Sequence, residues 1–190
     1  MSKVSKITER HRTEWFSLPS IDACKLTLDP NTAHALLSLS EECKKVVRSR
    51  EKHSYPDHPE RFEEFAQVLC TEGLTGRCYW EADLAGIVSI GMAYKSISQK
   101  GDDSQLGFND NSWSKKCYPF RKHASSSSLL SSYERVAVYL DWTAGMLSFY
   151  AINGFDLKHE RTLYSEFTEP LYPGFELLYH DLLDASVFLR

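Results

Sequence analysis

Long apolar runs, paired cysteines and positive charge are all scarce in this 190-residue sequence. No run approaches the ~18 consecutive apolar residues of a membrane-spanning helix, and the first residues lack the apolar segment of a secretory signal. The formal net charge is −4, which gives no electrostatic basis for binding nucleic acid or an anionic membrane. We therefore expect no membrane span, no nucleic-acid partner and a cytoplasmic location.

The number and spacing of the cysteines argue against a fold held by disulfides or by zinc. The five cysteines are an odd number, and no C-x-x-C pair occurs among them. Structural zinc sites need closely spaced Cys or His pairs, and the sequence has none. We therefore expect reduced, mostly buried thiols.

Motifs that carry catalysis are missing as well. The sequence contains no G-x-S-x-G, H-E-x-x-H, Walker loop or G-x-G-x-x-G. His53 and His58 lie near Asp57 and Glu60, but their segment offers no ligand pair fixed on a helix or strand. We therefore expect no enzyme activity, no cofactor and no metal.

Aromatic residues make up 13% of the chain, which favours strands over helix bundles. More than ten short apolar runs alternate with turn signals every 8–12 residues, the pattern of an all-β sandwich or barrel. The clearest pair of strands is the hairpin 134–150, in which Gly145 supplies a positive φ and Asp141 can cap the turn. A further turn is expected at 171–175, where Pro173 and Gly174 adjoin.

Residues 1–20 differ from the rest. Val4, Ile7, His11 and Trp15 recur at helical spacing, and Pro19 ends the pattern. We expect a short N-terminal linker helix here, and the basic residues beside the stripe leave a membrane or partner helix as the alternative.

Four motifs, in this order, resemble the PRY-SPRY (B30.2) family. They are LDP at 28–30, YWEA at 79–82, YLDWTAG at 139–145 and FTEPLYPGF at 167–175. The second is similar to the family's WEV, with Ala82 in place of Val. The third is similar to LDYEAG, with Trp142 and Thr143 departing from Tyr-Glu. The resemblance runs from about Ile21 to Arg190.

This resemblance implies a fold and a class of function. The fold is a bent β-sandwich of two antiparallel sheets, of the concanavalin-like jelly-roll type, in which a PRY segment (21–70) and a SPRY segment (71–190) form one domain. The function implied is a non-catalytic protein-interaction module with its specificity in loops on one face. Parents of such domains include tripartite-motif ubiquitin ligases, NOD-like receptors of innate immunity and stonustoxin-like pore-forming toxins. A toxin parent would make the chain secreted, and upstream regions of a parent could form a dimer.

Two regions are candidates for partner contact. The segment 51–65 matches the family's first variable loop in position and combines aromatic and charged residues, namely Tyr55, Asp57, His58, Arg61 and Phe62. The second region matches a pocket-lining strand of the family and comprises Lys116, Tyr118 and Phe120, closed by Phe175 and Tyr179. Ordinary packing is the alternative: Tyr55 and Phe62 as loop anchors, Phe175 as a core residue.

A third functional hypothesis is a sensor of phosphorylated small molecules, as in the butyrophilin relatives. Phosphate sites prefer clustered Arg and Lys donors. The cations available are Arg77, Lys115, Lys116, Arg121, Lys122 and His123.

Overall fold

The computed structural model describes residues 23–40, 42–118, 134–153, 156–179 and 184–190. The helix expected over 1–20 lies outside the described residues, as does Phe120. Among the helices of the described residues, none is long and apolar enough to cross a bilayer.

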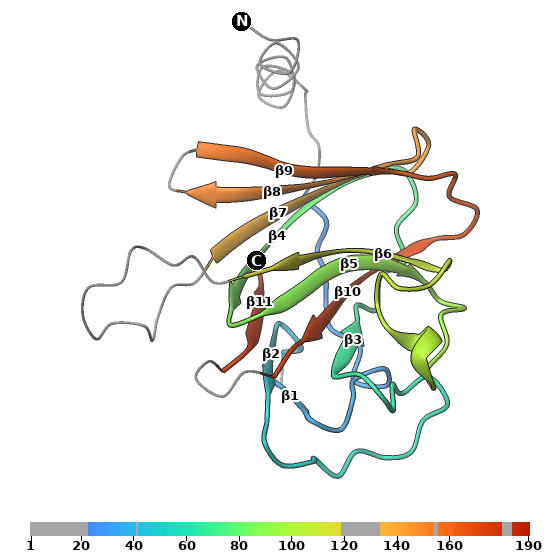
Figure 1. Cartoon of the computed structure of the whole chain (residues 1–190), viewed down its shortest axis with the longest axis vertical. Helices are drawn as coiled ribbons and strands as arrows, with labels where there is room; N and C mark the ends of the chain where they lie inside the picture. The colour runs from blue at the N-terminus through green and yellow to red at the C-terminus, as the bar shows by residue number, and fades with distance from the viewer. Residues whose placement is uncertain (1–22, 41, 119–133, 154–155, 180–183) are drawn as a thin grey trace, which may run out of the picture.

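Eleven strands in the described part of the chain form two antiparallel sheets (Figure 1). The seven-stranded sheet has the order β1 (Leu37–Leu39), β2 (Lys45–Arg48), β11 (Ser186–Leu189), β4 (Arg77–Ala85), β7 (Glu134–Asp141), β8 (Met146–Asn153) and β9 (Asp156–Tyr164). The four-stranded sheet has the order β3 (Gln67–Leu69), β10 (Leu171–Leu177), β5 (Val88–Tyr94) and β6 (Ser112–Cys117). The expected all-β sandwich of two antiparallel sheets is confirmed.

The core lies between the two sheets and follows from the period of two along each strand. In β4, Cys78, Trp80, Ala82 and Leu84 are buried, and the residues between them are half-buried. Trp80 meets Phe175 of β10 edge to face, with ring centroids 5.7 Å apart. Because this contact is fully enclosed, Phe175 is a core residue and not the partner-contact residue that the sequence suggested.

The sequence predicted a turn at 171–175. This prediction is wrong, because these residues belong to the central strand β10. Pro173 is tolerated there because its carbonyl accepts from the Cys70 N–H, on the β3 side. Within a strand, the nitrogen and the carbonyl of one residue point to the same side. The missing N–H of Pro173 therefore faces the β3 side of β10, where β3 itself ends at Leu69. No hydrogen bond to β5 is lost. Gly174 is required by the close approach of Leu69, whose Cδ2 would lie 2.8 Å from an added Cβ.

The β7–β8 hairpin forms as its sequence indicates. Gly145 has φ of 63°, and Asp141 Oδ1 accepts the Ala144 N–H at 3.0 Å. The indole of Trp142 donates to the Glu169 carbonyl at 2.9 Å, which ties the turn to the segment that leads into β10. Both turn roles expected from the sequence, the positive φ and the carboxylate cap, are confirmed.

One cysteine pair departs from the expectation of reduced thiols. Cys24 and Cys78 form a disulfide with a Cα–Cα distance of 5.9 Å. The pairing arises because residue 23 bridges Tyr79 and the Cys24 N–H donates to the Tyr79 carbonyl, which brings the early chain against β4. Cys43, Cys70 and Cys117 take no part in a disulfide.

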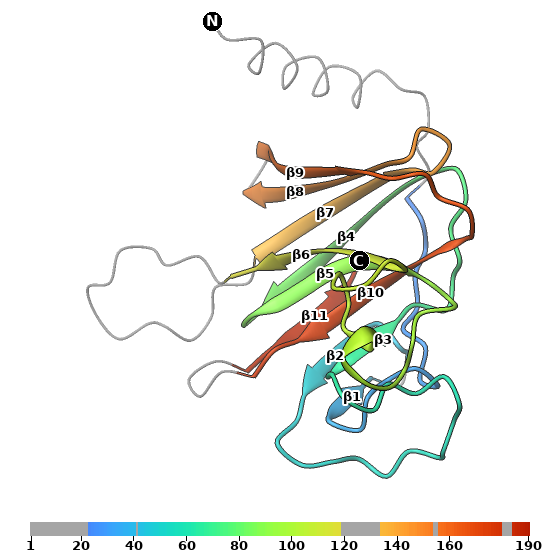
Figure 2. The same cartoon turned by 45° about the vertical axis from the view of Figure 1, so that its right-hand side comes forward.

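Part of the outer face of the four-stranded sheet is covered by the segment between β5 and β6. This segment folds back over the sheet, and its Ser104 carbonyl and Leu106 N–H both bond the side chain of Gln67. A small apolar cluster fills the space beneath: Phe62, Leu69, Ala93, Ile97 and Leu106, with Tyr172 at its edge. Figure 2 shows this covering segment crossing in front of β3 and β10. Gln105 of the same segment bonds Glu176 of β10, so the cover reaches the polar residues described next.

Candidate protein-binding site

A row of polar residues crosses the smaller sheet beside the covering segment. The strand register places Glu176 of β10 beside Ser89 of β5, and Ser89 beside Lys116 of β6. Phe175 and Leu177 are part of the core, so the alternation of side chains directs Glu176 to the outer face. The row therefore presents a carboxylate, a hydroxyl and an ammonium group side by side.

Glu176 is the unusual member of this row. Its side chain is on a residue only 5% exposed, and Oε1 accepts from Gln105 Nε2 at 3.1 Å. Oε2 is enclosed as well. Desolvation raises the pKa of this carboxyl, although hydrogen bonds from Gln105 and Ser89 and the charges of Lys116 and Arg48 oppose the shift. Glu176 is thus a buried carboxyl held by neighbours inside the domain.

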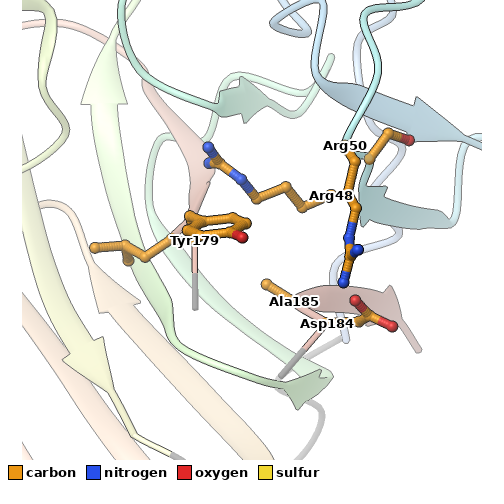
Figure 3. A pocket seen from close by; sticks show the side chains of 7 residues that line it. Arg48, Arg50, Tyr179, Asp184 and Ala185 are labelled. Atoms are coloured by element: carbon orange, nitrogen blue, oxygen red, sulfur yellow. The ribbon is translucent and has the colours of Figure 1, made fainter. Parts of the chain in front are cut away.

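Arg48, the last residue of β2, frames Glu176 from the larger sheet. Its Nη1 donates to the Leu177 carbonyl, and its guanidinium carbon lies 5.9 Å from the centroid of the Tyr179 ring. Figure 3 shows Arg48 reaching across to Tyr179, while Arg50 points toward Asp184. A small pocket opens between these side chains. Cationic and aromatic groups therefore meet beside the buried carboxylate.

Lys116 and Tyr118 complete the surface from β6. Lys116 Nζ lies 5.9 Å from the centroid of the Tyr118 ring. Tyr118 is 62% exposed and Tyr179 is 60% exposed. We name this surface the Glu176 face, which consists of Arg48, Lys116, Tyr118, Glu176 and Tyr179.

The segment 51–65 uses its conspicuous side chains to hold itself together. Arg61 donates to three carbonyls, those of Pro30, Ala33 and Pro56, and its guanidinium carbon lies 4.8 Å from the centroid of the Tyr55 ring. The Tyr55 hydroxyl donates to the Leu37 carbonyl at 2.8 Å. These contacts fit the alternative in which the aromatic and charged residues anchor the loop.

Phe62 is likewise an anchor. It is 1% exposed and lies in the cluster beneath the covering segment, so its proposed contact with a partner is wrong. An apolar side chain in a loop that is otherwise polar has an energetic reason to turn inward. Of this loop's candidates, Asp57 is exposed, whereas His58 is half-buried and its Nδ1 accepts the Glu60 N–H at 3.2 Å.

Metal and phosphate ligands are not gathered in the described part of the chain. No group of three or more His, Cys, Asp or Glu side chains there could hold a metal ion. Arg77 begins β4 in register with Asp141, and Lys115 and Lys116 lie in β6 of the other sheet. The remaining cations of the phosphate hypothesis, 121–123, fall outside the described residues.

Sequence reasoning missed Glu176 and Arg48. A signal for Glu176 exists, since it is a lone carboxylate between Phe175 and Leu177 in an apolar run. Arg48 carries no such signal, because its neighbours Leu177 and Tyr179 are about 130 residues away in the chain.

Comparisons with known proteins agree with this architecture. Family models for the SPRY-associated domain PRY and for the SPRY domain match residues 26–74 and 77–183. Stonustoxin subunit beta of Synanceia horrida is 41% identical over an alignment of 185 residues that covers 92% of this chain and 25% of that protein. Tripartite motif-containing protein 16 of Mus musculus is 32% identical over 92% of this chain and 33% of that protein. The chain thus spans a quarter to a third of these relatives.

Two solved structures are similar. The stonustoxin structure aligns with a TM-score of 0.77 at 35% identity, over 88% of this chain and 29% of that one. The PSpry domain of TRIM65 aligns with a TM-score of 0.70 at 24% identity, over 95% of both chains, which supports the fold alone. With the SPRY model matching more than half of its residues, this chain belongs to the SPRY domain family and carries the PRY segment in front of it.

Proposed function

We propose that this chain is a non-catalytic recognition module that binds a target protein through the Glu176 face. The observation that carries the proposal is the pair of exposed aromatic side chains, Tyr118 and Tyr179, each with a cationic side chain beside its ring. Tyr and Arg are the residue types that most often dominate binding energy at protein interfaces. The SPRY family is one of protein-interaction domains, which supports the same reading.

The parent protein has two candidates. A ubiquitin-ligase or innate-immune parent, located in the cytoplasm, is supported by the likeness to tripartite motif-containing protein 16. A secreted stonustoxin-like toxin subunit is supported by the higher identity to stonustoxin subunit beta. The sequence upstream in the parent distinguishes them, since RING and B-box cysteines or a pore-forming domain would each identify one class.

Site-specific photocrosslinking tests the binding surface. A p-benzoylphenylalanine group is introduced in place of Tyr118 or Tyr179, and in a control in place of Tyr164, which is 75% exposed at the end of β9. Irradiation in an extract of the source tissue is expected to give the same discrete partner band from positions 118 and 179 and none from 164. A band of equal yield from position 164 would overturn the assignment of the face. The absence of a band from all three positions would overturn it as well.

A further inference from the structure

A cluster of aromatic and apolar side chains lies on the outer face of the larger sheet, away from the smaller sheet. In β4 and β7 its members alternate with residues of the main core, and the two clusters are separate. Desolvation raises the pKa of all three tyrosines in it. We name it the outer-face cluster, which consists of the buried Ala137, Tyr139 and Tyr150 and the half-buried Tyr79, Ile152 and Leu157.

This face is more enclosed than the outward side of a sheet usually is. Antiparallel sheets commonly have one face on the core and one solvated, polar face. Tyr139 and Tyr150 are nevertheless only 6% exposed. Among the described residues, the strands and the short 3-10 turn outside this sheet belong to the other side of the core. The low exposure therefore points to a covering layer from the rest of the chain or from another molecule.

The described chain begins beside the outer-face cluster. Ala23 forms a parallel bridge with Tyr79, and the Cys24 N–H donates to the Tyr79 carbonyl at 2.9 Å. The disulfide between Cys24 and Cys78 fastens the chain at the same point. Residues 1–22 are thus tethered at the β4 end of the cluster. A tethered segment meets its binding surface at an effective concentration on the order of millimolar, an advantage that a second copy or a separate partner lacks.

The dimensions of this segment match those of the cluster. The apolar stripe from Val4 to Trp15 would extend about 17 Å as a helix. The neighbouring strands β4, β7, β8 and β9 span about 14 Å between the centres of the outer two. Residues 16–22 reach up to about 23 Å when extended, which is enough to connect Trp15 with Ala23.

From this placement we propose that residues 1–20 dock on the outer-face cluster as an amphipathic helix. The helix crosses the strands, with Trp15 over β4 and β7 and Val4 over β8 and β9. Isolated helices of this length are marginal in water, so the sheet stabilises the helix while the helix covers the tyrosines. In a longer parent, the chain before residue 1 would leave the domain at β9 in a fixed direction, which sets the orientation of the Glu176 face.

Photocrosslinking within the full chain tests the placement. A p-benzoylphenylalanine group replaces Trp15 or Val4, and in a control Thr13, on the opposite side of the expected helix. In the band that migrates as a monomer, mass spectrometry is expected to find links from position 15 to β4 or β7 and from position 4 to β8 or β9. Equal links from position 13, or none from 4 and 15, would overturn the proposal. The same links in a dimer band would assign the face to a second copy and overturn it as well.

Hydrogen–deuterium exchange tests the docking with ordinary substitutions. Amides of residues 5–15 are expected to exchange at least about tenfold faster in Ile7→Asp than in wild type, because a carboxylate on the apolar stripe opposes burial. Thr13→Asp adds the same charge on the opposite side and should exchange like wild type. Equal exchange in all three chains would overturn the proposal.

Flotation with vesicles of phosphatidylcholine and phosphatidylserine tests the membrane as the occupant of the apolar stripe. Wild type is expected to remain unbound. Wild type that floats with the vesicles, together with Ile7→Asp that does not, would overturn docking on the sheet.

Discussion

Arg61 and Glu176 are charged residues that differ in their burial and in their hydrogen bonding. Arg61 is half-buried and gives hydrogen bonds to three carbonyls of its own loop and of the segment before it. Glu176 is buried, and desolvation raises the pKa of its carboxyl. The first arrangement stabilises the fold, whereas the second lowers stability where the carboxyl is ionised.

The role of Arg61 predicts a stability loss without a binding phenotype. Arg61→Ala leaves the carbonyls of Pro30, Ala33 and Pro56 without their donor, and we expect it to lower the free energy of unfolding by about 1–3 kcal/mol. Arg161→Ala, at an exposed position of β9, should change it by less than about 0.5 kcal/mol. Urea denaturation followed by tryptophan fluorescence measures both. Equal effects of the two substitutions would argue that Arg61 is free to contact a partner.

The raised pKa of Glu176 predicts that replacing this residue increases the stability of the fold, by an amount that depends on pH. Because burial raises the pKa of this carboxyl, the folded chain retains a proton that the unfolded chain has already released over an interval above the ordinary Glu pKa. Stability therefore falls as the pH rises through that interval. Glu176→Gln removes the titration, so its melting temperature should exceed that of wild type at about pH 7, and the advantage should vanish below the ordinary value of about 4.3.

Thermal unfolding of wild type and Glu176→Gln from pH 3.5 to pH 8 checks this direction. Glu166→Gln, at an exposed position, is expected to follow wild type throughout. A variant that is less stable than wild type at neutral pH would mean that the carboxylate is satisfied in the folded chain.

At the scale of elements, alternating apolar residues predict strands well where both flanks carry ordinary turn signals. The hairpin of β7 and β8 is the clearest case, with its cap at Asp141 and its positive φ at Gly145. The prediction fails at β10, where Pro173 and Gly174 are usual signals of a turn. There the tertiary neighbours decide, because β3 ends beside the proline and Leu69 occupies the space above the glycine.

The hairpin turn allows a quantitative test of glycine. Gly145→Ala must adopt a positive φ and also place its Cβ 2.1 Å from the Ser165 carbonyl oxygen, so the backbone of that segment has to move. Gly101 has φ of 73° with ψ of −179°, a region that only glycine enters readily, and nothing lies within 4 Å of an added Cβ, so Gly101→Ala reports a backbone cost without a contact. We expect about 1–3 kcal/mol for Gly101→Ala and at least about 2 kcal/mol more for Gly145→Ala. Chemical denaturation measures both, and similar values would contradict the contact at Ser165.

The candidate site shows what sequence reasoning can and cannot supply. The family resemblance identified Lys116, Tyr118 and Tyr179 as candidates for one surface, and their role stays a prediction until a partner is found. It also included Phe62 and Phe175, since an aromatic residue in a loop or beside a turn looks the same in sequence whether it faces inward or outward. Only the layers of the fold separate these cases.

At the scale of the whole molecule, the disulfide between Cys24 and Cys78 joins the early chain to β4 across 54 residues. Closing a loop of that length restricts the unfolded chain, and we expect reduction to lower the free energy of unfolding by about 2–4 kcal/mol. Urea denaturation with and without dithiothreitol measures the change, and mass spectrometry of the alkylated chain verifies the bond. The Cys24→Ser, Cys78→Ser double variant should not respond to the reductant. Identical midpoints for oxidised and reduced wild type would contradict the linkage.

The order of the larger sheet has a consequence for how the protein is made. β11, the last strand in the sequence, lies between β2 and β4 and pairs with both. While the ribosome still holds residues 186–189, the early strands β1 and β2 have no neighbour through which to join β4. Until residues 186–189 have been made, the edge of β4 that they cover stays unpaired. Closure of the larger sheet is accordingly expected to wait for these residues to leave the ribosome, because β11 pairs with strands that are far from it in the sequence.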